Sequence, residues 1–351
     1  MIPLLSLLRH GRIDMSERQV LIAQLLAIIV DYKQDRIDEP DEAHVKRWLA
    51  QFDGDVQLDV LRETVHVLEQ TYFSKDKVEE IFSGLIYDDD FGDGAAEFWS
   101  EACLLDIQQG GNSQRDLVQM FSRLVAEEFG EEVSVNSCDA SNYFYLDDAV
   151  FSGNRLLADV AAWINDSAPR SAELYIVVIA MHSYGNFNVG KRLDKVIAES
   201  GKNIRYHWRF VIEFEDRLRY NSDSDVLRPK NAPDNQDVTN YISEMSRAPE
   251  YRVGNNRGGH AIFSSAAGRN LIEQQFLIAG AKIRRICPNL PTRHRPLGYN
   301  SLEMLGFGSM FVTYRNCPNN APLALWVGDP WYPLFPRSTN ADAAVNRLLH
   351  W

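Results

Sequence analysis

Hydrophobic residues recur every three to four positions in four segments between residues 16 and 86. In the first segment, Val20, Leu21, Leu25, Ile28 and Ile29 form one apolar stripe of a helix. The fourth segment follows Ser74, a residue type that often accepts a hydrogen bond at a helix N-terminus. The pattern predicts a small helical bundle, and we find no chemical motif within it.

The pattern changes after the acidic stretch YDDDFGDG at residues 87–94, which we interpret as a solvated linker. Apolar runs rich in Val, Ile and Tyr then alternate with helical patterns. Strands are expected at about 102–108, 143–147, 172–183 and 204–215. Strands that are buried on both faces and joined by helices are typical of right-handed βαβ units. The sequence therefore predicts an α/β fold with a parallel sheet.

The residue types change again after about residue 216, where Asn, Asp, Pro and Arg become frequent and one helix is expected at 269–279. The predicted organisation has four parts. They are a tail at 1–14, a helical domain at 15–90, an α/β core at 91–250 and a C-terminal extension at 251–351. We expect this extension to be irregular α+β structure that completes or covers a site on the core.

Composition limits the function classes. The 351 residues carry a net charge of −13, which disfavours non-specific binding of nucleic acids. The four cysteines form no CxxC pair, and no zinc, flavin, haem or dinucleotide motif is present. No apolar run reaches the length of a membrane span, and Arg9 follows the first apolar run instead of preceding it. We expect a cytoplasmic protein without a membrane partner.

The stretch YFYLDDAVFSGNRLL, residues 143–157, carries the clearest chemistry. A buried strand is expected to end at Asp147 and Asp148, and two adjacent carboxylates are favoured where a diol or a divalent cation compensates their repulsion. The turn 151–154 then presents backbone amides at the start of a helix, where phosphate binds well. A diol site followed by a phosphate site matches a 5-phosphoribosyl group. The plainer interpretation is that Asp and Ser only cap the next helix.

This stretch resembles the phosphoribosyl-pyrophosphate loop of type I phosphoribosyltransferases. The resemblance covers about residues 95–215 and implies that Asp147 and Asp148 contact the ribose hydroxyls and a Mg²⁺ ion bound with pyrophosphate or phosphoribosyl pyrophosphate. It implies a phosphate loop formed by Val150, Phe151, Ser152, Gly153 and Asn154. It also implies a pyrophosphate loop formed by Gln109, Gly110, Gly111, Asn112 and Ser113.

One departure from the family pattern concerns Phe151. Many members of the family carry Thr or Asp at this place, and the Asp can act as a general base. A phenyl ring neither binds phosphate nor moves a proton. Phosphate binding is therefore expected here, while the standard base-exchange mechanism is not.

Other candidate residues lie further along the chain. His182 ends the strand at 172–183 and His260 lies in a glycine-rich stretch, and either imidazole would serve as an acid or a base. The plainer interpretation is that His182 is structural and that the glycine-rich stretch is a surface loop. Arg315 and Asn319 are suited to reading a nucleotide base, although Asn also favours turns. The basic segment Lys282–Arg295 would bind a pyrophosphate, a nucleotide or a nucleic-acid backbone, or would simply be a solvated face.

The whole chain resembles phosphoribosyltransferase-like proteins with a C-terminal extension, which occur in bacterial anti-phage gene clusters, including some retrons. The resemblance implies a toxic effector that is held in check by a partner, such as a complex of reverse transcriptase with non-coding RNA and DNA. The expected function is chemistry at C1 of a phosphoribosyl group in phosphoribosyl pyrophosphate, a nucleotide or a nucleic acid. The alternative is a non-catalytic module that binds a nucleotide or phosphoribosyl pyrophosphate and works through partner contacts.

Overall fold

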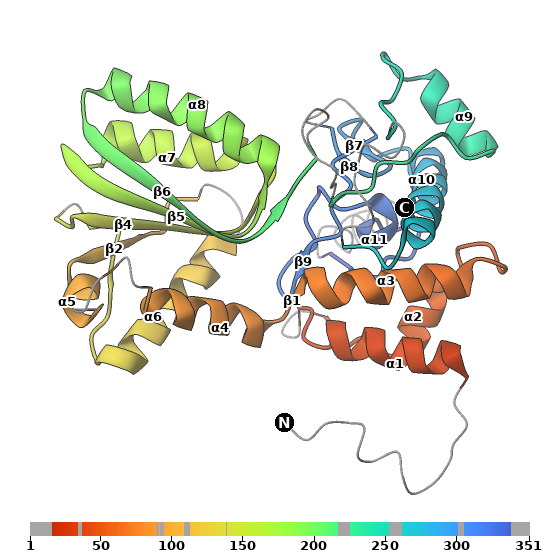
Figure 1. The fold of residues 1–351 in the computed structure, drawn as a ribbon, viewed down its shortest axis with the longest axis horizontal. Helices are drawn as coiled ribbons and strands as arrows, with labels where there is room; N and C mark the ends of the chain where they lie inside the picture. Colours follow the sequence, from red (N-terminus) through yellow and green to blue (C-terminus); the bar gives the residue numbers. More distant parts are fainter. Residues whose placement is uncertain are drawn as a thin grey trace, which may run out of the picture.

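The computed structural model describes residues 16–33, 37–88, 91, 95–108, 113–137, 139–216, 225–252, 262–300 and 305–337. Figure 1 shows two bodies joined side by side, one built around a sheet and the other mostly helical. The helices and strands of the first body follow one another along the chain from α4 to β6, whereas the second body combines elements that precede α4 with elements that follow β6.

A five-stranded, fully parallel sheet forms the first body, with strand order β3-β2-β4-β5-β6. The strands are β2 (Ala102–Leu105), β3 (Ser134–Val135), β4 (Asn142–Val150), β5 (Ser171–His182) and β6 (Asn203–Phe214). The predicted α/β class with a parallel sheet is therefore confirmed. The short edge strand β3 was not predicted, because its two exposed residues carry no apolar run.

Helices cover both faces of this sheet, as the buried Val, Ile and Tyr runs require. On one face lie α7 (Asn154–Asp166) and α8 (Ser183–Ser200), and on the other lie α4 (Lys75–Ile86), α5 (Ala95–Ser100) and α6 (Ser113–Phe129). Figure 1 shows the first pair above the sheet and the second set below it. Ser74 caps α4 as predicted, since its Oγ accepts a hydrogen bond from the Lys77 amide at 3.2 Å.

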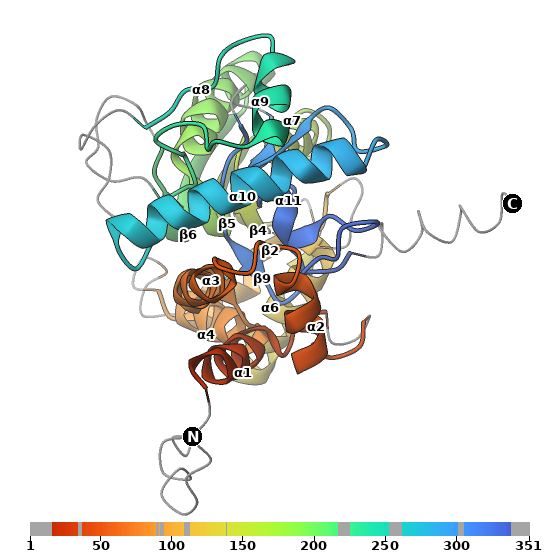
Figure 2. The ribbon, with the colours of Figure 1, turned by 90° about the vertical axis from the view of Figure 1, so that its right-hand side faces the viewer.

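The second body combines the N-terminal helices with the C-terminal extension around one apolar core. Figure 2 shows the long helix α10 running across the molecule near α3. Tight packing is evident at Trp48, whose Nε1 donates to the Ala324 carbonyl at 2.9 Å. The helices are α1 (Glu17–Ile29), α2 (Glu42–Leu49), α3 (Gln57–Thr71), α9 (Gln236–Ser243), α10 (Ala266–Ile286) and α11 (Leu323–Trp326). The short strands are β1 (Tyr72–Phe73), β7 (His294–Arg295), β8 (Gly298–Tyr299) and β9 (Val312–Thr313).

Packing crosses the predicted domain boundaries in two places. Strand β1, which follows α3, pairs in parallel with β9 of the extension. Helix α4 contacts α6 and contributes Val78 and Phe82 to a core that it shares with the sheet. The division at residues 90 and 250 stays a prediction. Within the described ranges, no helix is long and apolar enough to cross a membrane.

Candidate functional site

Strand β4 lies at the centre of the sheet and carries Asp147 and Asp148 close to its carboxyl end. The sequence predicted that the strand stops at these two residues, and this was wrong, because β4 continues to Val150. The longer strand β5 keeps pairing with β4 up to Val150, which lies opposite Met181. On the other side, β2 ends at Leu105, opposite Tyr145. The two carboxylates therefore lie just past the end of β2.

Both carboxylates are buried, with Asp147 6% and Asp148 9% exposed. Asp147 Oδ1 accepts a hydrogen bond from the Asp148 amide at 2.9 Å, and Asp147 Oδ2 accepts a longer one from Gln108 Nε2 at 3.4 Å. Burial, followed by the negative charge of Asp148, raises the pKa of Asp147 well above its usual value. Asp148 Oδ2 has no hydrogen-bond partner in the part of the chain that the structure describes. A buried oxygen without a partner points to a missing donor or cation.

The turn after β4 leads directly into α7. Gly153 has φ of 72°, in the left-handed region, and any side chain there would collide with Val189 of α8. Helix α8 also holds the turn through Asn188, whose Nδ2 donates to the Ser152 carbonyl at 2.6 Å. The backbone at residues 152–154 is thus fixed at the N-terminus of α7, where an anion is favoured.

Arg192 of α8 adds a positive charge to this turn. Its Nη1 donates to Asn154 Oδ1 at 2.8 Å, and its side chain is otherwise exposed. Sequence reasoning missed Arg192, because 38 residues separate it from Asn154 and no local spacing connects them.

Phe151 is buried and does not face a free phosphate site. Its ring lies 5.8 Å from that of Phe307, which belongs to the C-terminal extension. The same Phe307 ring lies 5.0 Å from the His182 imidazole, in an edge-to-face arrangement. The aromatic side chain of Phe307 therefore brings the extension to the carboxyl edge of the sheet, where it contacts the ends of the neighbouring strands β4 and β5.

His182 ends β5 and caps α8. Its Nδ1 accepts a hydrogen bond from the Tyr184 amide at 3.1 Å, so the neutral ring carries its proton on Nε2. Nε2 is buried and has no hydrogen-bond partner among the described residues. Burial lowers the pKa of His182 to about 3. At neutral pH the side chain is a neutral hydrogen-bond donor. The role of His182 as an acid or a base stays a prediction.

This burial gives a testable dependence of stability on pH. In the unfolded chain His182 takes up a proton near pH 6.5, whereas the folded protein resists protonation down to about pH 3. The unfolded state therefore binds more protons below pH 6.5, and the free energy of unfolding falls by about 2 kcal/mol between pH 7 and pH 5. His182→Asn keeps an acceptor for the Tyr184 amide and should lose this part of the dependence. Urea denaturation at the two pH values measures it.

His294 is the matched control for that experiment, because burial also lowers its pKa, to about 4. His294→Asn should remove its own share of the pH dependence without affecting the share of His182. If His182→Asn retains the full pH dependence of the wild type, the neutral buried imidazole is the wrong description.

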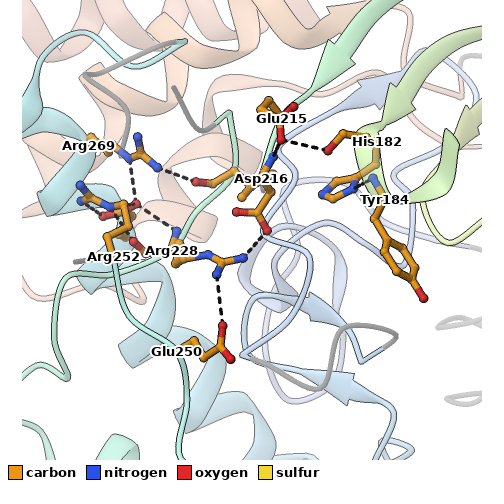
Figure 3. Close-up of polar contacts among 11 residues, drawn as sticks. His182, Tyr184, Glu215, Asp216, Arg228, Glu250, Arg252 and Arg269 are labelled. Carbon is orange, nitrogen blue, oxygen red and sulfur yellow. Dashed lines mark hydrogen bonds and ion pairs between the residues drawn. The ribbon is translucent and has the colours of Figure 1, made fainter. Parts of the chain in front are cut away.

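A second acidic pair, Glu215 and Asp216, follows β6 at the neighbouring strand end (Figure 3). Glu215 Oε1 accepts hydrogen bonds from Ser183 Oγ at 3.2 Å and from the Asp216 amide at 3.0 Å. Asp216 forms a buried ion pair with Arg228. Sequence analysis did not identify this pair, although the same signal, two acidic residues after an apolar strand, was present in IEFED.

Arg228 connects the strand end to a buried cluster on α10. Its amide donates to Glu273 Oε1 at 3.0 Å. Glu273 is 0% exposed and also pairs with Arg252 and with Arg269, whose Nε lies 2.9 Å from Oε1. Figure 3 shows the Arg228 guanidinium between Asp216 and Glu250. These paired charges fix the end of β6 to the extension.

A small cavity opens beside Arg228, lined also by Asp216, Glu250 and Gly306. Its volume of about 10 Å³ suits one water molecule. Arg228 Nη1 has no hydrogen-bond acceptor among the described residues, and Glu250 Oε2 lies 4.0 Å away. The cavity is too small for a nucleotide.

The remaining predicted residues do not gather around Asp147 in the described structure. Arg315 forms an ion pair with Asp116 in the first turn of α6, and Asn319 Oδ1 accepts a hydrogen bond from Arg337. Ser113 is the first residue of α6. The predicted pyrophosphate-loop residues 109–112 and His260 lie outside the described residues.

Two arginines of the basic segment Lys282–Arg295 are held by contacts within the protein. Arg284 Nη1 donates to the Leu290 and Pro291 carbonyls at 2.8 and 2.9 Å. Arg285 forms a two-point ion pair with Asp237 of α9, at 2.6 and 3.1 Å. The first contact lies within the segment, and the second connects it to α9. A nucleic-acid site there stays a prediction.

No group of three or more His, Cys, Asp or Glu side chains within the described ranges is arranged to hold a metal ion. A Mg²⁺ ion bound with pyrophosphate would not need such a group, since Mg²⁺ commonly takes one or two carboxylates and completes its shell with phosphate oxygens and water. The buried Asp147 and Asp148 fit this chemistry, because Asp148 Oδ2 lacks a hydrogen-bond partner among the described residues.

One solved structure that is similar to the chain is the Helicobacter pylori xanthine-guanine-hypoxanthine phosphoribosyltransferase, with 12% identity and a TM-score of 0.24. The alignment covers 40% of this chain and 84% of that enzyme. No curated protein sequence matches the chain. The model of one family matches residues 45–337, which include the sheet, the strand-end carboxylates and most of the extension, and the chain belongs to this family, PRTase-CE.

Proposed function

We propose that the chain binds a 5-phosphoribosyl group at the carboxyl edge of its sheet and acts at C1 of that group. The observation that carries this proposal is the buried pair Asp147 and Asp148, in which Asp148 Oδ2 lacks a hydrogen-bond partner among the described residues. Two ribose hydroxyls would supply the donors that these oxygens need. Membership of the PRTase-CE family supports the same ligand class.

The 5-phosphate would bind at the turn 152–154, at the N-terminus of α7. Backbone amides of this turn would donate to the phosphate oxygens, and Arg192 would add a nearby positive charge through its contact with Asn154. A Mg²⁺ ion, held by Asp147 and Asp148, would neutralise the pyrophosphate of a phosphoribosyl pyrophosphate ligand. Gly153 would keep the backbone close to the ligand, because no side chain fits against Val189.

The reaction would break the bond between C1 and its leaving group, which departs with the electron pair. The acceptor then forms the new bond to C1 and releases a proton. Positive charge develops on the ribose ring, and the carboxylates of Asp147 and Asp148 would stabilise it. A base at the position of Phe151 is ruled out by its ring, so positioning of the reactants would supply most of the rate.

Titration calorimetry with a graded set of ligands tests this proposal. Phosphoribosyl pyrophosphate with Mg²⁺ should bind more tightly than ribose 5-phosphate, and ribose 5-phosphate more tightly than inorganic phosphate, because each step adds one group that the site recognises. 2-Deoxyribose 5-phosphate should bind weakly, since it has only one of the two hydroxyls. Equal affinity for the deoxy and the ribose compounds would contradict a diol site at Asp147 and Asp148.

A second candidate function is a non-catalytic module that senses a nucleotide or phosphoribosyl pyrophosphate. The packing of Phe307 against Phe151 and His182 favours it, because an aromatic side chain of the extension lies at the edge where an acceptor would enter. The two functions differ in turnover. A module would bind phosphoribosyl pyrophosphate without releasing pyrophosphate when nucleobases, nucleosides or nucleic acids are offered as acceptors, whereas an enzyme would release it with one of them.

We further propose that the activity is toxic to the host cell and that a partner, such as a complex of reverse transcriptase with non-coding RNA and DNA, restrains it as part of an anti-phage system. The support is the resemblance of the chain to effectors of such gene clusters. Inducible expression of the chain alone, compared with co-expression of neighbouring genes, tests the proposal by colony counts.

A further inference from the structure

Strand β6 is the outermost strand of the sheet and is unusually long for an edge strand. It contains 12 residues, and its one neighbour in the sheet is β5. Figure 1 shows β6 running along one side of the first body. Strands in globular proteins commonly have about 5–6 residues. Along its outer side, the backbone N–H and C=O groups have no strand partner in the part of the chain that the structure describes.

Proteins usually protect such an edge with charged side chains, especially lysine, with proline, with a bulge or with a covering segment. The β6 sequence NIRYHWRFVIEF contains no proline, glycine or lysine, and its pairing with β5 keeps one register from Asn203 to Phe214. Two of its apolar side chains are exposed, Phe210 by 41% and Val211 by 51%. Among the described residues no other strand covers this edge, its register is regular, and its exposed side chains include both apolar ones, Phe210 and Val211, and charged ones, Arg205 and Glu213.

Helix α8 adds to this surface. Tyr206 of β6 donates a hydrogen bond to Asp194 Oδ1 at 2.9 Å and lies near Gly190, which places residues 190 and 194 of α8 on the side that faces β6. Phe187 lies three residues before Gly190 and so shares that side of the helix. It is 70% exposed. Of the eight exposed large apolar side chains in the described structure, four come from this region: Tyr184, Phe187, Phe210 and Val211.

We propose that β6 pairs in antiparallel fashion with β6 of a second copy of this chain, about a two-fold axis at Arg209. The β6 sequence supports a symmetric partner because it is complementary to itself in this register. Arg205 lies opposite Glu213 of the second copy, and the symmetry repeats this opposite-charge pair. Trp208 lies opposite Phe210 of the second copy, which is a favourable aromatic pair.

A shift of the axis to Trp208 removes this match. With the axis at Trp208, Arg205 would face Val211 and His207 would face Arg209 of the second copy, so no opposite charges would meet. In the proposed register the two Arg209 side chains lie near the axis. Each has an acidic partner within its own chain, since Arg209 Nε lies 3.4 Å from Asp88. The like charges at the axis are therefore compensated, and the dimer has a continuous ten-stranded sheet.

Complementary charge reversals test the interface and its register together. The wild type should sediment as a dimer. Arg205→Glu places like negative charges opposite Glu213, and Glu213→Arg places like positive charges opposite Arg205, so each variant should raise the dimer dissociation constant at least tenfold. In a mixture of the two variants, every reversed residue meets an opposite charge. The mixture should therefore form a mixed dimer, which analytical ultracentrifugation with one labelled variant detects.

Lys46→Glu on α2 is the matched control. Lys46 pairs with Glu42 on its own helix, as Arg205 pairs with Glu173 on β5, so both substitutions break an intrachain ion pair but only one lies at the edge. The control should remain dimeric. Phe210→Lys, which keeps both charges of the pair, should be monomeric and should melt within a few degrees of the wild type.

Three results would overturn the proposal. A wild-type protein that remains monomeric at a concentration of about 100 μM would exclude the dimer. Dimers of Arg205→Glu, Glu213→Arg and Phe210→Lys that are all as stable as the wild type would exclude β6 as the interface. Single variants that are monomeric and remain so when mixed would exclude the Arg209-centred register.

Discussion

Replacing both Asp147 and Asp148 with asparagine should weaken the binding of phosphoribosyl pyrophosphate with Mg²⁺ by at least about 100-fold, because hydrogen bonds to charged groups contribute roughly 1.5–3 kcal/mol each. Asparagine keeps the shape of the side chain but removes the charge that a diol or a cation would meet. Titration calorimetry of the double variant beside the wild type measures the loss. If the chain is a toxic effector, the same variant should restore normal colony counts on induction.

The fold should survive this change. Burial and the charge of Asp148 raise the pKa of Asp147, so the folded state disfavours its carboxylate relative to the unfolded chain. When the pKa of a carboxyl group is higher in the folded than in the unfolded state, the free energy of unfolding falls as the pH rises from the unfolded pKa to the folded pKa. The double asparagine variant should therefore melt at the same temperature as the wild type at pH 7, or at a higher one.

Asp166→Asn on α7 makes the same chemical change at an exposed position and serves as the control. It should leave ligand affinity and toxicity unchanged. Wild-type affinity, or retained toxicity, in a double variant with a normal melting curve would place the ligand elsewhere. A double variant that binds normally but no longer releases pyrophosphate would assign the pair to the reaction and not to binding.

Local sequence patterns predicted the part of this site that lies within one stretch of the chain. An apolar run, two aspartates and a Ser-Gly turn before a helix all fall between residues 143 and 157, and the structure gives them that order. The strand boundary was wrong because it depends on β5, whose length allows pairing to continue to Val150. A boundary that is fixed by a neighbouring strand leaves no signal in the strand itself.

Contacts between distant segments were not predictable in the same way. Arg192 reaches Asn154 across 38 residues, and Phe307 of the extension reaches Phe151 across a much longer separation. The neutral state of His182 follows from burial beneath these segments, and the sequence shows only that a histidine ends an apolar strand. Residue types predicted which side chains are candidates for a chemical role. Packing determines the protonation state of these side chains and whether a ligand can reach them.

The joining of the N-terminal helices to the extension has a similar cause. Each predicted helix was correct as an element, because its apolar stripe is local. The segments against which these helices pack were not predicted. Trp48 of α2, for example, donates a hydrogen bond to the Ala324 carbonyl, which lies 276 residues later. An amphipathic pattern predicts which face of a helix is buried, but it does not predict which segment covers that face.

The buried cluster around Glu273 carries the largest expected effect on stability. Glu273→Gln keeps the size of the side chain but leaves Arg252 and Arg269 without their shared carboxylate, and both guanidinium groups are buried. Removing one partner of a buried ion pair costs about 3–5 kcal/mol, because the remaining charge is uncompensated. The free energy of unfolding from urea titration should fall by this amount, which is a large fraction of the stability of most domains.

Glu250→Gln provides the contrast within the same cluster. The Glu250 side chain is 48% exposed, and its oxygen lies 4.0 Å from Arg228 Nη1, so solvent screens the interaction and the loss should stay below about 1 kcal/mol. Replacing Arg252, Arg269 and Glu273 together with apolar residues of similar volume should recover most of the stability, since desolvation of the charges is then avoided. If Glu273→Gln costs no more than Glu250→Gln, the cluster does not fix the end of β6 to α10. A small loss in Glu273→Gln, whose amide oxygen still accepts from the Arg228 amide, together with a large loss in the apolar triple variant, would instead mean that this hydrogen bond, and not the charge balance, connects the end of β6 to α10.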